Sequence, residues 1–163
     1  MAVLEEAERR LPQTSLPPEI GEPRPGRRVD GFEVLSADGR VLSSVDVLAT
    51  PATYLFMTAG CEPCERLEAE LRRERNQLGA YPLRVVVDDG SPVPSLPFFV
   101  EVLRQRHRDV SRAFGNGVAP QSIAVGADGL VLAAEVTQSV DEVRRVAAAL
   151  EKGGVPEREA IFV

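Results

Sequence analysis

Cysteine, histidine and tryptophan are scarce in this chain of 163 residues, which has two cysteines, one histidine and no tryptophan. A tetrahedral zinc site takes four ligands, mostly cysteine and histidine. The two cysteines and His107 are too few for such a site, so we expect no metal. Lysine is nearly absent too: Lys152 is the only one, and arginine supplies the other cations. We attribute this to codon bias and not to a mechanism.

Blocks of basic residues and long apolar runs are also missing. The net charge is −6, which argues against nucleic acid as a partner. No apolar run approaches the roughly 20 residues of a membrane-spanning helix, and residues 1–10 are charged and unlike a signal peptide. Two histories stay open: a cytoplasmic protein, or an extracytoplasmic soluble domain whose membrane anchor is absent from this chain. Length and an apolar content of 44% predict one globular domain.

The order of apolar stretches and turn residues predicts an α/β protein with helices on both faces of a mixed sheet. Five prolines between residues 11 and 28 favour an extended lead-in. A hairpin over 32–48, a strand over 53–57, a helix over 65–77 and a strand over 83–87 are expected after it. A helix from Phe98 to His107 should follow, with Phe98 and Phe99 in the core, and then a short helix capped by Asp109. Strands over 121–125 and 130–136 and a last helix, which begins with the capping box Ser139-Val-Asp-Glu142, complete the predicted fold.

Both cysteines lie in the sequence Cys61-Glu62-Pro63-Cys64, between an apolar strand and a helix. This arrangement predicts a dithiol–disulfide redox site. Cys61 should be the N-cap, where unpaired N–H groups and the helix dipole lower the thiol pKa. We therefore expect Cys61 to be the nucleophile and Cys64 the buried resolving thiol, with Pro63 suited to the first turn. A purely structural disulfide here would close too short a loop to stabilise much.

Three stretches around this motif resemble a known family. The sequence from Tyr54 to Cys64 resembles the active-site strand of thioredoxin-fold proteins, in particular the TlpA/ResA and MauD-like thiol–disulfide oxidoreductases. Those proteins have a Phe five residues before the first Cys, as Phe56 is here. Residues 23–45 resemble their N-terminal hairpin, and residues 118–132 resemble the loop with their cis-proline and the hairpin after it. The resemblance covers residues 20–152.

The resemblance implies a thioredoxin-like three-layer fold, with a mixed central sheet and an N-terminal β-hairpin extension. Residues 1–28 would be an extension or linker, 29–153 the domain and 154–163 a tail. It also implies disulfide exchange with a protein partner, without a cofactor. Pro120 would be cis and face the dithiol, and the main chain of Ala119 would pair with an extended substrate strand. Without the resemblance, Pro120 is read as a trans proline that opens a strand.

The chain departs from the family at positions that affect the chemistry. It has no tryptophan near Cys61, and Leu55 stands where such reductases often have a buried carboxylate. Glu62 places a negative charge beside the nucleophile, which should raise the pKa of Cys61. We therefore hypothesise a more reducing couple than that of a site without this charge. The alternative is that Glu62 is solvated and contributes little.

Two other functions stay open. Thr58-Ala-Gly-Cys61 matches the T-x-x-C core of peroxiredoxins, although the proline that precedes their threonine is missing. A thiol peroxidase is therefore one alternative. The other is a non-catalytic thioredoxin-fold binding module with a vestigial dithiol. Protein-disulfide reduction separates the enzyme from the binding module, and peroxide consumption separates both from a peroxidase.

Overall fold

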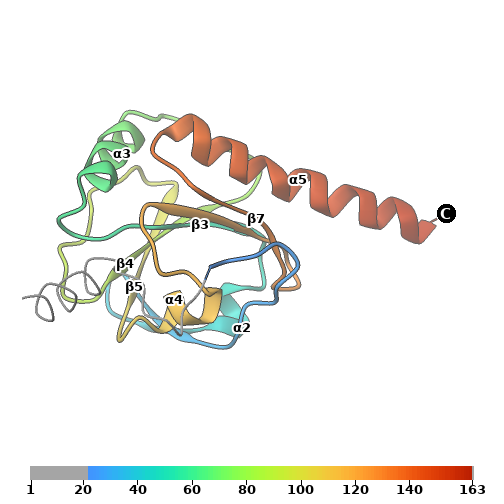
Figure 1. Ribbon diagram of the computed structural model, residues 1–163, viewed down its shortest axis with the longest axis horizontal. Helices are drawn as coiled ribbons and strands as arrows, with labels where there is room; N and C mark the ends of the chain where they lie inside the picture. The colour runs from blue at the N-terminus through green and yellow to red at the C-terminus, as the bar shows by residue number, and fades with distance from the viewer. Residues whose placement is uncertain (1–21, 163) are drawn as a thin grey trace, which may run out of the picture.

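A seven-stranded mixed sheet forms the centre of the computed structural model, which describes residues 22–162 (Figure 1). The expected features of residues 1–21 lie outside the described part. The order of strands across the sheet is β2-β1-β5-β4-β3-β6-β7. Their bounds are Glu33–Ser36 for β1, Val41–Ser43 for β2, Ala52–Phe56 for β3, Leu83–Asp88 for β4, Val100–Gln105 for β5, Gln121–Val125 for β6 and Val131–Val136 for β7.

Strands β3, β4 and β5 are parallel to one another and form the middle of the sheet. Antiparallel hairpins extend the sheet on both sides: β1 and β2 beyond β5, and β6 and β7 beyond β3. The turn between β1 and β2 contains Gly39, whose φ of +91° requires a residue without a Cβ. The expected mixed sheet with an N-terminal hairpin is confirmed.

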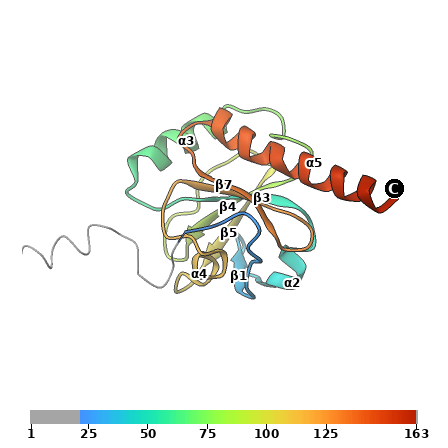
Figure 2. The same ribbon diagram turned by 45° about the vertical axis from the view of Figure 1, so that its right-hand side comes forward.

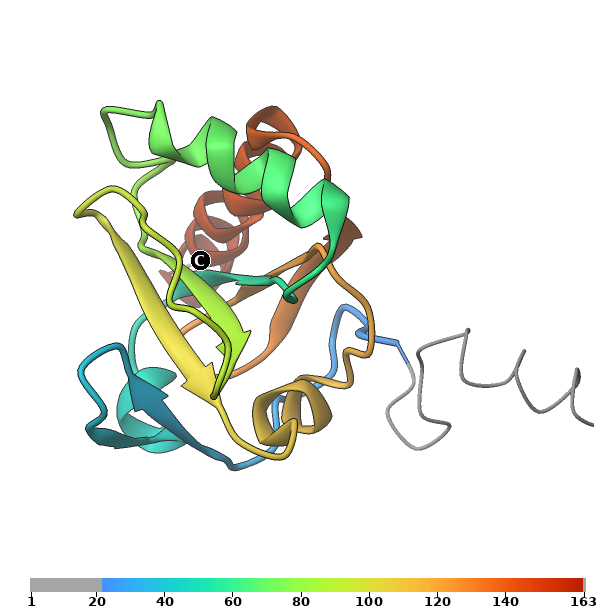
Figure 3. The same ribbon diagram turned by 90° about the vertical axis from the view of Figure 1, so that its left-hand side faces the viewer.

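In the described part of the chain, four helices cover the two faces of the sheet. They are α2 (Ser44–Val47), α3 (Glu62–Arg72), α4 (Asp109–Phe114) and α5 (Val140–Phe162). Helices α3 and α5 lie together on one face, and α2 and α4 lie on the other (Figures 1 and 2). Figure 3 shows α3 in green and α4 in orange on opposite sides of the sheet. The three layers agree with the sequence-based expectation.

Alternating side chains of β3 and of Met57, which directly follows it, supply both cores. Tyr54 and Phe56 belong to the cluster on the α4 face, whereas Leu55 and Met57 belong to the cluster under α3. All four are buried, because successive side chains of a strand point to opposite faces. On the α4 face, the Phe114 ring lies 4.8 Å from the Tyr54 ring, centroid to centroid. A strand buried on both sides gives a rigid base to the loop that follows it.

The helix predicted from Phe98 to His107 is wrong. Residues Val100–Gln105 form β5, which pairs in parallel with β4 over its whole length. Apolar residues at 98, 99, 102 and 103 fit helical spacing. They form a strand because the segment pairs between β4 and β1 in the sheet, and tertiary pairing overrides the local pattern. Phe98 was expected in the core and is 94% exposed, while Phe99 packs against the α3-side core.

Smaller differences concern helix ends. Helix α3 begins at Glu62 and ends at Arg72, whereas the sequence placed it over 65–77. Asp109 is the first residue of α4 and not its cap, since the N-cap is Arg108 and makes no side-chain capping bond. Helix α5 includes residues 154–162, where a separate C-terminal tail was expected.

The capping box at the start of α5 is confirmed, with Glu142 N–H donating to Ser139 Oγ at 3.2 Å. Part of the expected lead-in pairs with the far edge of the sheet: Gly26 N–H donates to Val131 O, and Val131 N–H donates to Arg27 O. These bonds cover an edge that would otherwise be exposed. Among residues 22–162, no helix combines the length and apolar character needed to cross a bilayer.

Candidate active site

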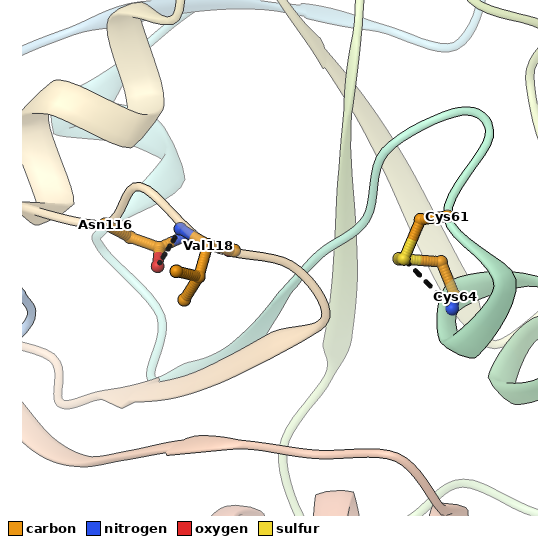
Figure 4. The surroundings of a disulfide bond; sticks show 4 residues. All are labelled: Cys61, Cys64, Asn116 and Val118. Carbon is orange, nitrogen blue, oxygen red and sulfur yellow. Dashed lines mark hydrogen bonds between the residues drawn. A yellow bond between two sulfur atoms is a disulfide. The ribbon is translucent and has the colours of Figure 1, made fainter. Parts of the chain in front are cut away.

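A disulfide joins Cys61 and Cys64 at the start of α3 (Figure 4). Cys61 is the N-cap, with extended φ and ψ of −99° and 111°, and its sulfur accepts a hydrogen bond from Cys64 N–H at 3.2 Å. The two Cα atoms are 5.2 Å apart, within the range of disulfides. Cys61 thus occupies the predicted N-cap, and its sulfur receives one of the N–H groups that the helix leaves unpaired.

The two sulfurs lie in different surroundings. Cys64 is 2% exposed and belongs to the apolar cluster that contains Leu55 and Leu67. Cys61 is partly exposed and lines a cavity at the molecular surface. Cys61 is therefore the more exposed of the two cysteines, and the cavity on its side is larger than the one that Cys64 lines.

The two residues between the cysteines lie in the first turn of α3. Pro63 stands where the missing N–H costs no helical hydrogen bond. Glu62 points into solvent with its side chain 81% exposed, and its carboxylate accepts a hydrogen bond from Arg66 Nη1 at 2.7 Å. The charge beside Cys61 is therefore partly balanced by Arg66, which weakens the influence that Glu62 was expected to have.

The segment with Ala119 and Pro120 lies beside the dithiol. The Ala119–Pro120 peptide bond is cis, as the family resemblance implies. Ala119 lines the same cavity as Cys61 and packs against the cluster that contains Cys64. Among the hydrogen bonds of residues 22–162, none uses the main-chain N–H or C=O of Ala119. These groups are available to an extended partner strand.

The cavity beside Cys61 has a volume of about 370 Å³. It lies where the parallel strands β3, β4 and β5 end, because its wall includes Met57 and Thr58 after β3, Asp88 of β4 and Gln105 of β5. The loop from Asn116 to Ala119 forms the wall opposite the disulfide (Figure 4). Ligands of open α/β sheets commonly bind at the carboxyl ends of the strands, so the position and the size both suit a binding site.

Three buried polar side chains of the cavity wall are occupied by other parts of the protein. Gln105 Nε2 donates to Ser111 Oγ at 2.9 Å, and Gln105 Oε1 accepts from Ser111 N–H at 2.8 Å. Asn116 bonds both the N–H and the C=O of Val118. These bonds fix the shape of the wall and leave little capacity for a ligand.

Sequence reasoning missed Asp88, Gln105, Arg108 and Asn116 as residues of the site. A signal existed for Asp88, because it directly follows a buried apolar strand whose end meets those of its parallel neighbours. Arg108 gave no usable signal, since the residues before it were expected to form a helix. Thr58 was singled out, and the structure places it in the same cavity wall as Cys61.

A second cavity, of about 200 Å³, lies on the Cys64 side of the disulfide. Its wall includes Cys64, Glu65 and Glu68, and the proline-rich loop after β4 closes it. Leu55 is fully buried, so the strand before the dithiol supplies no carboxylate. The acidic groups nearest to this side are therefore those of α3 itself.

No protein-family model matches the chain, and no curated protein matches its sequence. Solved structures do resemble it. A thio-disulfide isomerase from Thermus thermophilus superposes with a TM-score of 0.61 at 21% identity, over 80% of this chain and 97% of that one. A putative thiol:disulfide interchange protein DsbE from Chlorobium tepidum gives 0.60 at 18%, over 78% and 99%.

A thiol peroxidase from Chromobacterium violaceum gives a TM-score of 0.56 at 19% identity, over 81% of this chain and 88% of that one. At such identities the likeness concerns the fold. The chain has the thioredoxin-like fold, with its cysteine pair at the start of the helix that follows the central strand β3.

Proposed function

We propose that the protein is a thiol–disulfide oxidoreductase that exchanges electrons with a protein partner, of the TlpA/ResA/MauD-like kind. Cys61 is the attacking thiolate and Cys64 the resolving thiol. The observation that carries this proposal is the asymmetry of the disulfide at the start of α3: one sulfur faces a surface cavity and the other is buried beside it. A structural disulfide has no need of that asymmetry.

In the reducing direction, the reduced protein meets a disulfide of the partner. The Cys61 thiolate attacks one partner sulfur, the partner S–S bond breaks, and the released thiolate takes a proton. Cys64 then loses its proton and attacks the Cys61 sulfur, which re-forms the disulfide and releases the second partner thiol. The partner gains two electrons and two protons, and the Cys61–Cys64 pair loses them. The reverse direction uses the same steps.

The main chain of Ala119 supports a protein as the partner. Its N–H and C=O are unused within residues 22–162 and border the cavity of Cys61. An extended segment with a disulfide could pair there as an added strand, which would bring the partner sulfur to Cys61. Neither a metal nor an organic cofactor takes part in this exchange.

Insulin reduction with dithiothreitol as electron donor tests the proposal. We expect the native protein to accelerate the precipitation of insulin chains, and Cys61→Ser to abolish this. Cys64→Ser should instead accumulate a mixed disulfide at Cys61, detected by mass spectrometry after alkylation. Equal rates with the native protein and with Cys61→Ser would contradict the proposal and favour a non-catalytic binding module.

A thiol peroxidase is the second candidate, and one observation favours it. Thr58 lines the cavity together with Cys61, so its hydroxyl could contact a peroxide there. The buried resolving thiol three residues away makes dithiol exchange the better fit. Consumption of hydrogen peroxide that is lost in Thr58→Val and faster than insulin reduction would reverse this order.

A further inference from the structure

The cavity beside Cys61 has two charged residues that the proposed exchange with a protein does not use. Arg108 comes from the loop between β5 and α4, and Asp88 is the last residue of β4. Both are partly buried. Among residues 22–152, Arg108 forms no ion pair, and the one hydrogen-bond partner of the Asp88 side chain is Gln105 Nε2 at 3.4 Å. One cation and one anion therefore face the cavity with unused capacity.

The backbone at Arg108 is strained in a way that suggests a function. His107 and Arg108 have φ of 54° and 59°, and they are the only non-glycine residues between 22 and 162 with positive φ. Two consecutive residues in the left-handed region are costly for chains of L-amino acids, and such strain concentrates at functional sites. Arg112 Nη1 donates to His107 O and holds this turn.

Among the polar side chains that line the cavity, these two charged groups and the Thr58 hydroxyl are the ones with capacity left for a ligand. Gln105, Ser111 and Asn116 are occupied by hydrogen bonds within the protein. A ligand in the cavity can thus place a carboxylate at Arg108 and an ammonium at Asp88. A disulfide sulfur of the same ligand would lie near Cys61, which lines the same cavity.

We propose that this cavity takes a small disulfide built from amino acids, of which cystine is the simplest, with its carboxylate at Arg108 and its ammonium at Asp88. This inference rests on the proposed function and names a second partner for it. A dithiol carrier needs one partner that gives electrons and one that takes them. The strand site at Ala119 fits a protein, and the charged cavity fits the small disulfide.

The exchange balances as before. The Cys61 thiolate attacks one sulfur of cystine, one cysteine leaves as thiolate and takes a proton, and Cys64 displaces the second cysteine. Cystine becomes two cysteines with two electrons and two protons from the dithiol. Each charged contact is a charge-assisted hydrogen bond, and should change kcat/KM by about 10-fold.

Four small disulfides of similar length distinguish the contribution of the carboxylate from that of the ammonium group. L-Cystine has both groups, 3,3′-dithiodipropionate has the carboxylate, cystamine has the ammonium, and bis(2-hydroxyethyl) disulfide has neither. The assay follows oxidation of the reduced full-length protein by each disulfide. We expect kcat/KM for cystine to exceed that for the neutral disulfide by about 100-fold, from two contacts of about 10-fold each.

Two variants assign the contacts. Arg108→Gln should lower kcat/KM for cystine and dithiodipropionate about 10-fold relative to the neutral disulfide. Asp88→Asn should do the same for cystine and cystamine. Arg108→Lys keeps the charge and should retain most of the carboxylate preference. Arg106→Gln is the matched control, because Arg106 is exposed and does not line the cavity.

A native protein without preference for cystine over the neutral disulfide overturns the inference, and so does an Arg108→Gln variant that slows all four disulfides equally. If insulin is reduced while no charge preference exists, the proposed function stands and only this inference fails. If the protein reduces neither insulin nor any small disulfide, the proposed function fails and the inference with it.

Discussion

The buried phenol of Tyr54 should make the free energy of unfolding depend on pH above about pH 10. Its side chain is fully buried on β3, and the hydroxyl accepts a hydrogen bond from Arg84 Nη1 at 2.8 Å. Burial disfavours the phenolate and raises the pKa of Tyr54 above its ordinary value of 10.0, although the Arg84 guanidinium acts in the opposite direction. The folded protein therefore keeps this proton at a pH where the unfolded chain has released it.

The sign of the pH dependence follows. The contribution of Tyr54 to stability is complete below pH 10 and is lost as the pH rises through the folded-state pKa. Between the two pKa values the free energy of unfolding should fall by up to about 1.4 kcal/mol per pH unit. Lys152 is the only lysine, so few other side chains change charge in this range.

Tyr54→Phe is the perturbation, and urea unfolding of the oxidised protein from pH 8 to 11 is the assay. The Tyr54 hydroxyl accepts from Arg84 Nη1 at 2.8 Å and donates to Val47 O at 3.5 Å. At pH 8 the variant should lose only about 1 kcal/mol, because Arg84 still donates to Val47 O at 2.5 Å and pairs with Glu101 at 2.8 Å. Above pH 10 the native protein should lose stability more steeply than the variant. Tyr81→Phe is the control, since it keeps Tyr54. Equal slopes for Tyr54→Phe and the native protein would refute the reasoning.

Three further perturbations test the site and its support. Glu62→Gln should raise the reduction potential of the dithiol by only about 10 mV, because Arg66 already balances most of the Glu62 charge. No change or a fall, measured against a glutathione buffer, would contradict the charge argument. Thr53→Val should stabilise by about 1 kcal/mol in urea unfolding, since Thr53 Oγ1 is the one buried side-chain polar atom of residues 22–152 without a hydrogen-bond partner. A loss of stability would contradict this reasoning. Arg108→Gly should raise the free energy of unfolding by about 0.5–1 kcal/mol, because glycine adopts the positive φ of this position without strain. It should also lose the preference for disulfides that carry a carboxylate. Arg108→Gln should lose the same preference without the gain in stability.

The parts of the site that could be predicted from the sequence depend on interactions between residues a few positions apart in the chain. A cysteine that caps a helix and a second one three residues later are fixed by the helix itself, so the places of Cys61 and Cys64 followed from their spacing. Ser139 and Glu142 follow the same logic. The cis bond before Pro120 came from the family resemblance, because its local sequence also fits a trans proline.

The parts that could not be predicted depend on strand order. Residues Val100–Gln105 have apolar positions that fit a helix and a buried strand equally well, and only the free edge of β4 decides between them. A helix at 98–107 would leave Arg108 away from the sheet edge at which Asp88 ends β4, so the two residues do not predict a common site. The cavity was therefore missed, although the cysteine beside it was the strongest signal in the chain.

In the proposed exchange, the surroundings of the two sulfurs would set the order of the two attacks. Cys64 lies among Leu55 and Leu67, where an apolar environment disfavours a thiolate. Cys61 lies at the helix N-terminus, where the helix dipole favours a thiolate. Attack by Cys61 therefore comes first, and Cys64 gives up its proton only when a mixed disulfide on Cys61 offers its thiolate a bond. Such reductases often have a buried carboxylate behind the dithiol, and Leu55 stands at that position here. The attack by Cys64 on the mixed disulfide therefore has no base on β3 to take the Cys64 proton. We expect this second attack, which releases the product, to limit turnover more than the first attack by Cys61.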